Sequence, residues 1–331
     1  DDIKKIGRNI FGINIVSFKN FINKTKSKSI DEIYLALPTI DKKDRTKILN
    51  KLSVLNIRIK SLPPLNELLK GNFSNTDILS LDIEELLERG ASNLDKNAYK
   101  NIFANKNVLV TGAGGSIGSE LCRQILYNKP KTLILFDVSE FAIYKMQQEI
   151  VQSTNNLKET KIVYLIGSVQ NTKTVESIIK KWRPNIIYHA AAYKHVPIVE
   201  NNEEEGFRNN VMGTLKVAIS SVKYKVDNFV LVSTDKAVRP SNVMGHTKRL
   251  AEMILQGIVN EDLIEIKNNK GIYQKYKQET NFSIVRFGNV LESSGSVVPL
   301  FRNQIRKGGP ITITHKDVTR YFMTTKEAAQ L

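Results

Sequence analysis

The chain has 331 residues, enough for two domains of ordinary size. Its formal net charge is +16, but the basic residues are spread along the whole chain. Without a basic stripe interleaved with aromatic residues, this charge does not indicate nucleic-acid binding, and it favours an anionic substrate or an anionic membrane surface nearby. A single cysteine, Cys122, excludes a disulfide framework, and no apolar run is long enough to span a bilayer.

Residues 1–75 predict a partial, nucleotide-binding-like α/β domain. A short apolar run at 32–37 predicts a strand, residues 41–55 have helical spacing, and residues 57–59 resume a strand. Residues 76–105 then predict a connector with two helical pieces, at 83–88 and 97–104.

From residue 106 onward, apolar strands alternate with segments of helical spacing. The predicted strands are 107–110, 132–136, 161–166, 185–189, 228–232 and 282–287, and the predicted helices are 117–127, 140–152, 172–181 and 211–222. This alternation predicts an α/β fold with a doubly wound parallel sheet covered on both faces. Residues 267–280 are polar and predict an exposed excursion. The chain stops inside a predicted helix at 326–331, so further elements are expected beyond it.

A glycine-rich turn follows the first of these strands. Gly112, Gly115 and Gly118 stand between strand and helix, with Ser116 and Ile117 at the start of the helix. Glycines in this pattern allow a tight turn and close approach of the backbone to a pyrophosphate, which the helix N-terminus attracts. The five residues therefore predict a dinucleotide site, and a purely structural turn is the alternative.

The second strand ends at Asp137. A carboxylate at this position accepts hydrogen bonds from the adenosine ribose and repels a 2′-phosphate, which favours NAD over NADP. The alternative role for Asp137 is to cap the helix that follows Ser139.

A third cluster lies after the strand at 228–232. Thr234, Asp235 and Lys236 follow it directly, and a helix beginning near Asn242 would carry Met244 and Lys248 one turn apart. The carboxyl end of a parallel strand is where such folds build their sites. The competing interpretation of Asp235 and Lys236 is a surface salt bridge, worth about 0–1 kcal/mol.

Together these stretches resemble the extended short-chain dehydrogenase/reductases. More narrowly, they resemble the bacterial UDP-N-acetylglucosamine 4,6-dehydratases of the large membrane-anchored type, which act in polysaccharide biosynthesis and protein glycosylation. The resemblance covers residues 106–331, and its matching stretches are 111–123, 189–197, 233–240, 242–249, 286–290 and 319–324.

The resemblance implies a catalytic domain at 106–331 and, before it, transmembrane helices that this chain does not contain. It places the full-length protein at the cytoplasmic face of the inner membrane, with the present fragment soluble. A homo-oligomer, by default a dimer, is expected for such folds.

The resemblance also implies roles for single residues. Lys248 would hold the nicotinamide ribose, and Ala190, Ala191 and Ala192 would let the backbone pass close to the cofactor. Ser168 and Val169 would lie at the adenine, where relatives usually carry an Asp in place of Ser168, so this contact departs from the family pattern. The substrate-binding candidates are Lys194, His195, Pro197, Asn289 and Arg320.

The reaction that the resemblance implies is an internal redox elimination. NAD removes a hydride from carbon 4 of the sugar, water leaves across carbons 5 and 6, and the hydride returns to carbon 6. Related dehydrogenases use a Tyr one turn before the Lys as base, but here that position is Met244, whose thioether cannot take a proton. The hypothesis is that Asp235 shuttles the proton with Thr234 as relay, and that Lys236 is the carbon 5 base. A lysine base must lose its proton, which burial or a neighbouring cation favours.

Three alternatives stay open. A nucleotide-sugar 4-epimerase shares the first oxidation but needs no carbon 5 base, and a second type of dehydratase inverts carbon 5, although Met244 favours retention. A non-catalytic NAD-binding sensor or scaffold is the alternative from another class. No cluster of residues at metal-ligand spacing accompanies the histidines, so no metal is predicted.

Overall fold

The computed structural model describes residues 3–25, 30–37, 57–61, 102–153, 160–267, 271–291, 296–313 and 319–331, and single residues 40, 44, 47, 48, 51, 52, 55, 293, 315 and 317. The chain divides into two compact units, Asp1–Gly90 and Ala91–Leu331. The division falls inside the predicted connector, most of which, including the helical piece at 83–88, lies outside the described residues. The predicted domain limits therefore stay predictions.

The first unit contains a short parallel strand pair. β3 (Glu32–Leu35) pairs with β4 (Arg58–Ser61), close to the two strands predicted here. Of the helix predicted at 41–55, the described residues 44, 47, 48, 51 and 52 are helical. Its buried Leu52 packs with Leu35 and with Phe18 and Phe21 of α1 (Phe18–Thr25). The remaining elements are η1 (Ile3–Lys5) and an antiparallel pair, β1 (Asn9–Ile10) with β2 (Ile13–Asn14).

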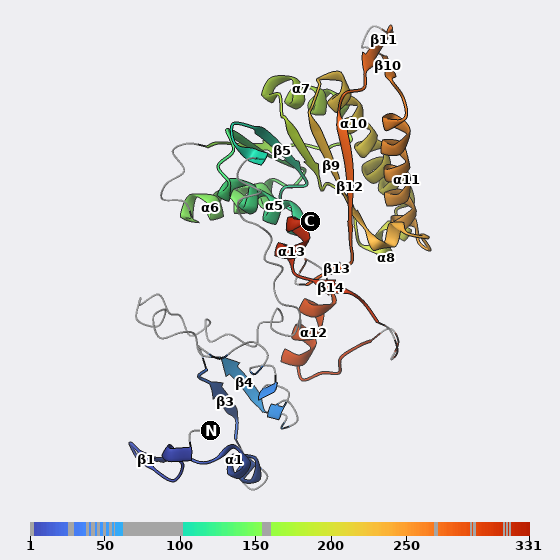
Figure 1. Ribbon diagram of the computed structural model, residues 1–331. Coiled ribbons are helices and arrows are strands. Elements are labelled where there is room, and N and C mark those ends of the chain that lie inside the picture. Colours follow the sequence, from blue (N-terminus) through green and yellow to red (C-terminus); the bar gives the residue numbers. More distant parts are fainter. Residues whose placement is uncertain are drawn as a thin grey trace. The chain divides into compact units, whose positions relative to one another are not determined.

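The second unit is built on a six-stranded parallel sheet (Figure 1), which confirms the predicted fold class. In spatial order its strands are β12 (Asn281–Phe287), β9 (Asn228–Thr234), β8 (Ile186–His189), β5 (Asn107–Thr111), β6 (Thr132–Asp137) and β7 (Lys161–Ile166). The chain runs outward from β5 in one direction and from β8 in the other. The strand order therefore reverses between β5 and β8, which is where ligands bind in open α/β sheets.

Helices cover both faces of this sheet (Figure 1). α5 (Ser116–Tyr127) and α6 (Glu140–Ser153) pack on one face, and α7 (Thr172–Trp182), α10 (Gly213–Lys223) and α11 (Val243–Val259) pack on the other. The strands supply alternate residues to the two faces: Val108 and Val110 face α5, whereas Leu109 faces the α10 side. This period of two explains why the strands are apolar throughout.

Shorter elements complete the second unit. They are α8 (Val196–Glu200), α9 (Glu203–Phe207), the π-helical turn η3 (Arg208–Met212), the 3-10 turn η4 (Asp235–Ala237), β13 (Asn289–Val290), α12 (Val297–Arg306), β14 (Phe322–Met323) and α13 (Thr325–Gln330). Among the described residues, no helix has the length and apolar character that crossing a membrane requires.

The described residues of the segment 267–280 are mostly exposed, as predicted. The segment is not irregular, however, because β10 (Leu263–Lys267) and β11 (Tyr273–Lys277) form an antiparallel hairpin. Only Ile264 and Tyr276, which are paired in register, pack against the core. With one core contact per strand, the sequence carries too little alternation to reveal the hairpin.

Candidate functional site

The glycine-rich turn lies at the point where the strand order reverses. Gly112 has φ +67°, and a Cβ built on it would lie 2.6 Å from the Ala191 nitrogen on the neighbouring β8 side. A Cβ on Gly118 would lie 2.0 Å from the Gly112 carbonyl oxygen. α5 then begins at Ser116 without a side-chain cap. The turn therefore has the close backbone approach that a pyrophosphate needs, and these residues fit a dinucleotide.

Asp137 ties this turn to the end of β6. Its Oδ2 accepts a hydrogen bond of 2.9 Å from the Gly114 N–H, and its Oδ1 accepts one of 2.9 Å from Ser139 N–H. The Ser139 hydroxyl accepts a hydrogen bond of 3.2 Å from Ala142 N–H in the first turn of α6. Ser139 therefore caps the helix, and Asp137 lies beside the glycine turn.

A cavity of about 880 Å³, here called the main cavity, extends from the glycine turn past the ends of β8 and β9. Fifteen of the predicted site residues line it: Gly112, Gly115, Ser116, Ile117, Gly118, Ala190, Ala192, Lys194, His195, Thr234, Lys236, Met244, Lys248, Asn289 and Arg320. They come from both halves of the sheet, so the fold brings the predicted cofactor turn and the predicted chemical groups into one space.

The end of β9 forms the rim of the main cavity. Asp235 Oδ1 accepts hydrogen bonds from Thr234 Oγ1 at 3.0 Å and from Lys236 Nζ at 3.3 Å. Lys236 Nζ also donates to Asn289 Oδ1 at 3.1 Å. The Lys236 and Asp235 side chains are 35% and 47% exposed. Lys236 and Asp235 therefore form an ion pair, and Lys236 also lines the main cavity.

The floor of the main cavity is formed by α11. Asn242 caps this helix by accepting a hydrogen bond of 2.8 Å from Gly245 N–H. A Cβ on Gly245 would lie 2.5 Å from the Lys236 carbonyl oxygen, so a glycine lets α11 approach the rim closely. Met244 and Lys248 are only 3% and 4% exposed. Burial lowers the pKa of Lys248 to about 8, against the opposing charge of Glu252.

Glu252 connects the floor to the rim. This carboxylate is fully buried and accepts hydrogen bonds from Ser233 Oγ at 2.6 Å, from Arg286 Nε at 2.8 Å and from Arg249 Nη1 at 3.2 Å. Burial raises the pKa of Glu252, but these hydrogen bonds, with Arg286 first, bring it below its ordinary value. Because Ser233 precedes Thr234, the network fixes the strand end that carries the rim.

His189, the last residue of β8, is fully buried and neutral. Thr214 Oγ1 donates to the Asn210 carbonyl oxygen at 2.6 Å, so the His189 Nε2–H must donate to Thr214 Oγ1 at 3.0 Å. Thr111 Oγ1 then donates to Nδ1 at 2.7 Å. Burial, with the Lys248 charge second, lowers the pKa of His189 to about 3. No group of three potential metal ligands occurs among the described residues.

Several predicted residues do not line the main cavity. Pro197 is exposed in the first turn of α8, where a proline is tolerated because that N–H needs no partner, and its assignment to the sugar pocket stays a prediction. The Val169 side chain is buried in the core cluster beneath α7 and α10. Ala191 contacts Gly112 through its backbone. Asp235 contacts Lys236 and Thr234, and Ser168 lines a second cavity.

The main cavity also contains residues that the sequence did not single out. These include Tyr193, Ile198, Asn202, Glu205, Phe287, Ser293, Ser296, Val297 and Phe322. Glu205 belongs to an acidic run, a pattern that ordinarily indicates only the first turn of a helix. The signal for Tyr193 was its place in the stretch 189–197, between the small residues and Lys194.

Residues 108–331 match the model of a protein family described as "Polysaccharide biosynthesis protein". The capsular polysaccharide biosynthesis protein CapD of Staphylococcus aureus is 43% identical over 306 residues, covering 92% of this chain and 48% of CapD. A UDP-glucose 4-epimerase of Rickettsia rickettsii is 33% identical over 234 residues, covering 70% of this chain and 62% of that protein. The chain therefore spans only about half the length of CapD.

The same fold occurs among solved structures. The X-ray structure of Pen from Bacillus thuringiensis is 35% identical in sequence and superposes with a TM-score of 0.59. The match covers 69% of this chain and 66% of Pen.

Proposed function

The chain belongs to the Polysaccharide biosynthesis protein family, and from this premise we propose that it dehydrates UDP-N-acetylglucosamine to the UDP-4-keto-6-deoxy sugar with NAD as cofactor. If bound here, NAD would supply the acceptor for the carbon 4 hydride and the donor for its return to carbon 6, so the reaction would involve no net oxidation. The fit of the glycine turn to a pyrophosphate and the position of Asp137 at the end of β6 support NAD as the dinucleotide.

The observation that carries the proposal is the rim cluster beside Met244. A buried thioether accepts no proton, yet Thr234, Lys236 and Asn289 line the same cavity, and hydrogen bonds through Asp235 connect Thr234 to Lys236. Besides a group that takes the carbon 4 hydroxyl proton, a 4,6-dehydratase needs a base for the carbon 5 proton and an acid for the hydroxyl that leaves carbon 6. Asp235 and Lys236 supply one of each.

The proposed proton path uses these groups in sequence. Thr234 passes the carbon 4 hydroxyl proton to Asp235, while Lys248 orients the nicotinamide ribose. Lys236 then removes the proton at carbon 5, Asp235 returns its proton to the hydroxyl that leaves carbon 6, and Lys236 reprotonates carbon 5. The products are the 4-keto-6-deoxy sugar and one water. Lys236 must release a proton before it can act as a base.

The opposite end of the main cavity suits an anionic group. Ser296 precedes α12, and its hydroxyl is buried without a hydrogen-bond partner among the described residues. Ser296, Val297 and Arg320 all line the cavity. A helix N-terminus and a guanidinium both bind phosphates, so we assign the diphosphate of UDP to this end. Lys194, His195 and Asn289 would contact the sugar.

The second candidate is a nucleotide-sugar 4-epimerase, which the similarity to a protein named UDP-glucose 4-epimerase favours. An epimerase returns the hydride to carbon 4 and needs neither a carbon 5 base, the role proposed for Lys236, nor an acid for a leaving hydroxyl. A dehydratase that inverts carbon 5 would use the same residues, and a non-catalytic NAD sensor would use none. The inner-membrane location and the homo-oligomeric state are likewise proposals from the family resemblance.

The test is incubation of the purified chain with UDP-N-acetylglucosamine carrying deuterium at carbon 4, followed by proton NMR. The proposal predicts a new carbon 6 methyl signal in which one hydrogen is the transferred deuterium. Conversion to the carbon 4 epimer without a methyl signal would establish the epimerase instead. NAD binding without any turnover of the UDP-sugar would support the sensor.

A further inference from the structure

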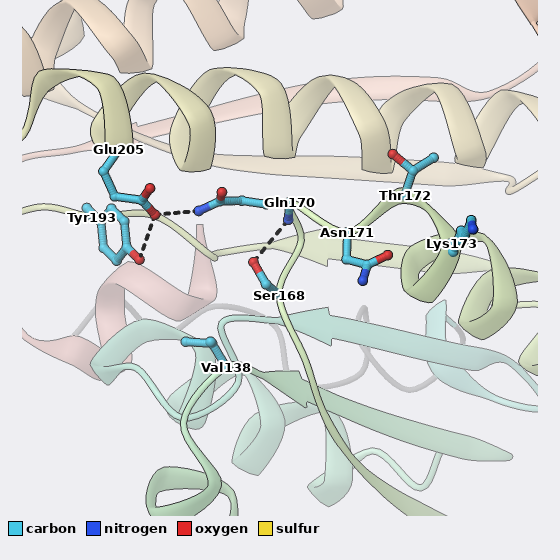
Figure 2. A pocket seen from close by; sticks show the side chains of 8 residues that line it. All are labelled: Val138, Ser168, Gln170, Asn171, Thr172, Lys173, Tyr193 and Glu205. Atoms are coloured by element: carbon cyan, nitrogen blue, oxygen red, sulfur yellow. Dashed lines mark hydrogen bonds between the residues drawn. The ribbon is translucent and has the colours of Figure 1, made fainter.

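A second cavity of about 560 Å³, here called the side cavity, lies at the carboxyl ends of β6 and β7 (Figure 2). Val138, which follows β6, and Ser168, which follows β7, are both among its lining residues. Tyr193 and Glu205 line the side cavity and the main cavity alike. In a doubly wound sheet the half that begins with the glycine turn receives the adenosine end of a dinucleotide. The side cavity is therefore in the position for the adenine ring.

Ser168 is a weak acceptor for the adenine amino group, because its hydroxyl is neutral. The exocyclic amine of adenine is a hydrogen-bond donor and needs an acceptor. The Ser168 hydroxyl oxygen already accepts a hydrogen bond of 3.1 Å from Gln170 N–H, as Figure 2 shows. A carboxylate in the same cavity would be a stronger acceptor for the amine, because hydrogen bonds to an ionised group are about twice as strong as neutral ones.

Three side chains on the far wall of the side cavity form a connected cluster (Figure 2). Gln170 Nε2 donates to Glu205 Oε1 at 2.6 Å, and the Tyr193 hydroxyl donates to the same oxygen at 3.4 Å. Among the hydrogen bonds of the described residues, none ends on Glu205 Oε2. The cluster thus offers a carboxylate oxygen and the Gln170 amide oxygen as acceptors.

The backbone of this cluster is held in place. Lys216 Nζ donates to the Gln170 carbonyl oxygen at 2.7 Å. Asn210, in the π-helical turn, accepts from Tyr193 N–H at 2.8 Å and donates to the Tyr193 carbonyl oxygen at 2.9 Å. Gln170 and Tyr193 therefore come from anchored loops, and Glu205 comes from α9. A preorganised wall of this kind can select a ligand by its hydrogen-bond pattern.

We propose that Glu205, positioned by Gln170 and Tyr193, accepts the hydrogen bond of the cofactor's adenine amino group and makes the protein selective for adenine dinucleotides. This inference rests on the proposed NAD-dependent function. A purine that carries an oxygen in place of the amine would present an acceptor to the Glu205 carboxylate, and two facing acceptors repel each other.

The test compares NAD with nicotinamide hypoxanthine dinucleotide, which differs from it only in this amino group. Dissociation constants of both are measured by titration calorimetry on the wild-type chain and on Glu205→Ala. We expect the wild type to bind NAD about tenfold more tightly than the analogue, in keeping with one charge-assisted hydrogen bond. Glu205→Ala should lose this difference, mainly by weaker NAD binding.

Two further variants serve as controls. Glu205→Gln retains the shape of the side chain and should also reduce the discrimination, which covers the case of a misfolded alanine variant. Glu203→Ala removes an exposed carboxylate from the same helix and should bind like the wild type. Equal binding of both dinucleotides by the wild type, or full discrimination in both Glu205 variants, would overturn the inference alone. A wild-type chain that does not bind NAD would overturn the proposed function with it.

Discussion

The main cavity contains two lysines in contrasting surroundings. Lys248, on the floor, is 4% exposed, and burial lowers its pKa to about 8. Lys236, on the rim, is 35% exposed and is held by Asp235 and Asn289. The floor is fixed from beneath by the buried Glu252 network, whereas the rim depends on contacts that a bound ligand can replace.

The two lysines are therefore expected to affect different properties: Lys248 the free energy of unfolding, and Lys236 mainly the reaction. A buried charge affects the free energy of unfolding whether or not a ligand is present, because burial removes it from water. A half-exposed ion pair contributes about 0–1 kcal/mol, so its residues are free to serve a reaction. We therefore expect substitutions on the floor to change the free energy of unfolding and substitutions on the rim to change turnover.

The largest effect is expected at the rim. Lys236→Met removes the proposed carbon 5 base and should lower kcat by about 10²–10⁴-fold, the usual contribution of a general acid or base. The midpoint of urea unfolding should stay close to that of the wild type, because the lost ion pair is half exposed. A large loss of stability in Lys236→Met would contradict the expectation that the rim residues contribute little to the free energy of unfolding.

A second effect concerns the network under the floor. Glu252→Ala leaves the buried Ser233 hydroxyl without its acceptor and should cost about 1–3 kcal/mol in the free energy of unfolding. The Arg286 and Arg249 side chains are 39% and 38% exposed, so water solvates their charges in the variant. Chemical denaturation measures this cost. The matched control is Glu261→Ala, an exposed carboxylate just after α11, which should change stability by no more than about 0.5 kcal/mol.

The third substitution, Lys248→Met, is expected to raise the free energy of unfolding. The folded state lowers the pKa of Lys248 from 10.5 to about 8, so below pH 8 the protein carries a buried charge that costs about 3 kcal/mol. Between pH 8 and 10.5 the unfolded chain binds more protons than the native one, and stability rises with pH. Lys248→Met should therefore stabilise the cofactor-free protein at pH 7 and remove that rise, while turnover is lost.

The matched control for this effect is Lys236→Met, in which the pH dependence of stability should resemble that of the wild type. Thermal unfolding at pH 7, 8, 9 and 10 measures both variants. A Lys248→Met protein that is less stable than the wild type at pH 7 would show that the ammonium finds compensating partners in the native state.

The sheet and the glycine turn were predictable because they depend on local patterns. Leu109 and Val110 show that neighbouring strand residues enter opposite cores, so an unbroken apolar run indicates a doubly covered strand. The cluster of Lys236 with Asn289 could be expected only from the family resemblance, since 53 residues separate the two.

Other features depend on tertiary placement, which local patterns do not report. No local pattern predicted that Glu205 reaches Gln170, since 35 residues separate the two. The π-helical turn that carries Asn210 is also invisible in the sequence, because its residues have ordinary helical spacing.

The most direct test of the central claim is proton exchange at carbon 5. UDP-N-acetylglucosamine is incubated in deuterated water with NAD and either the wild type or Lys236→Met, and incorporation of solvent deuterium at carbon 5 is followed by NMR. We expect the wild type to incorporate deuterium at carbon 5 and Lys236→Met to incorporate none, with equal NAD binding by both proteins. Exchange at the wild-type rate in Lys236→Met would contradict the assignment of Lys236 as the base.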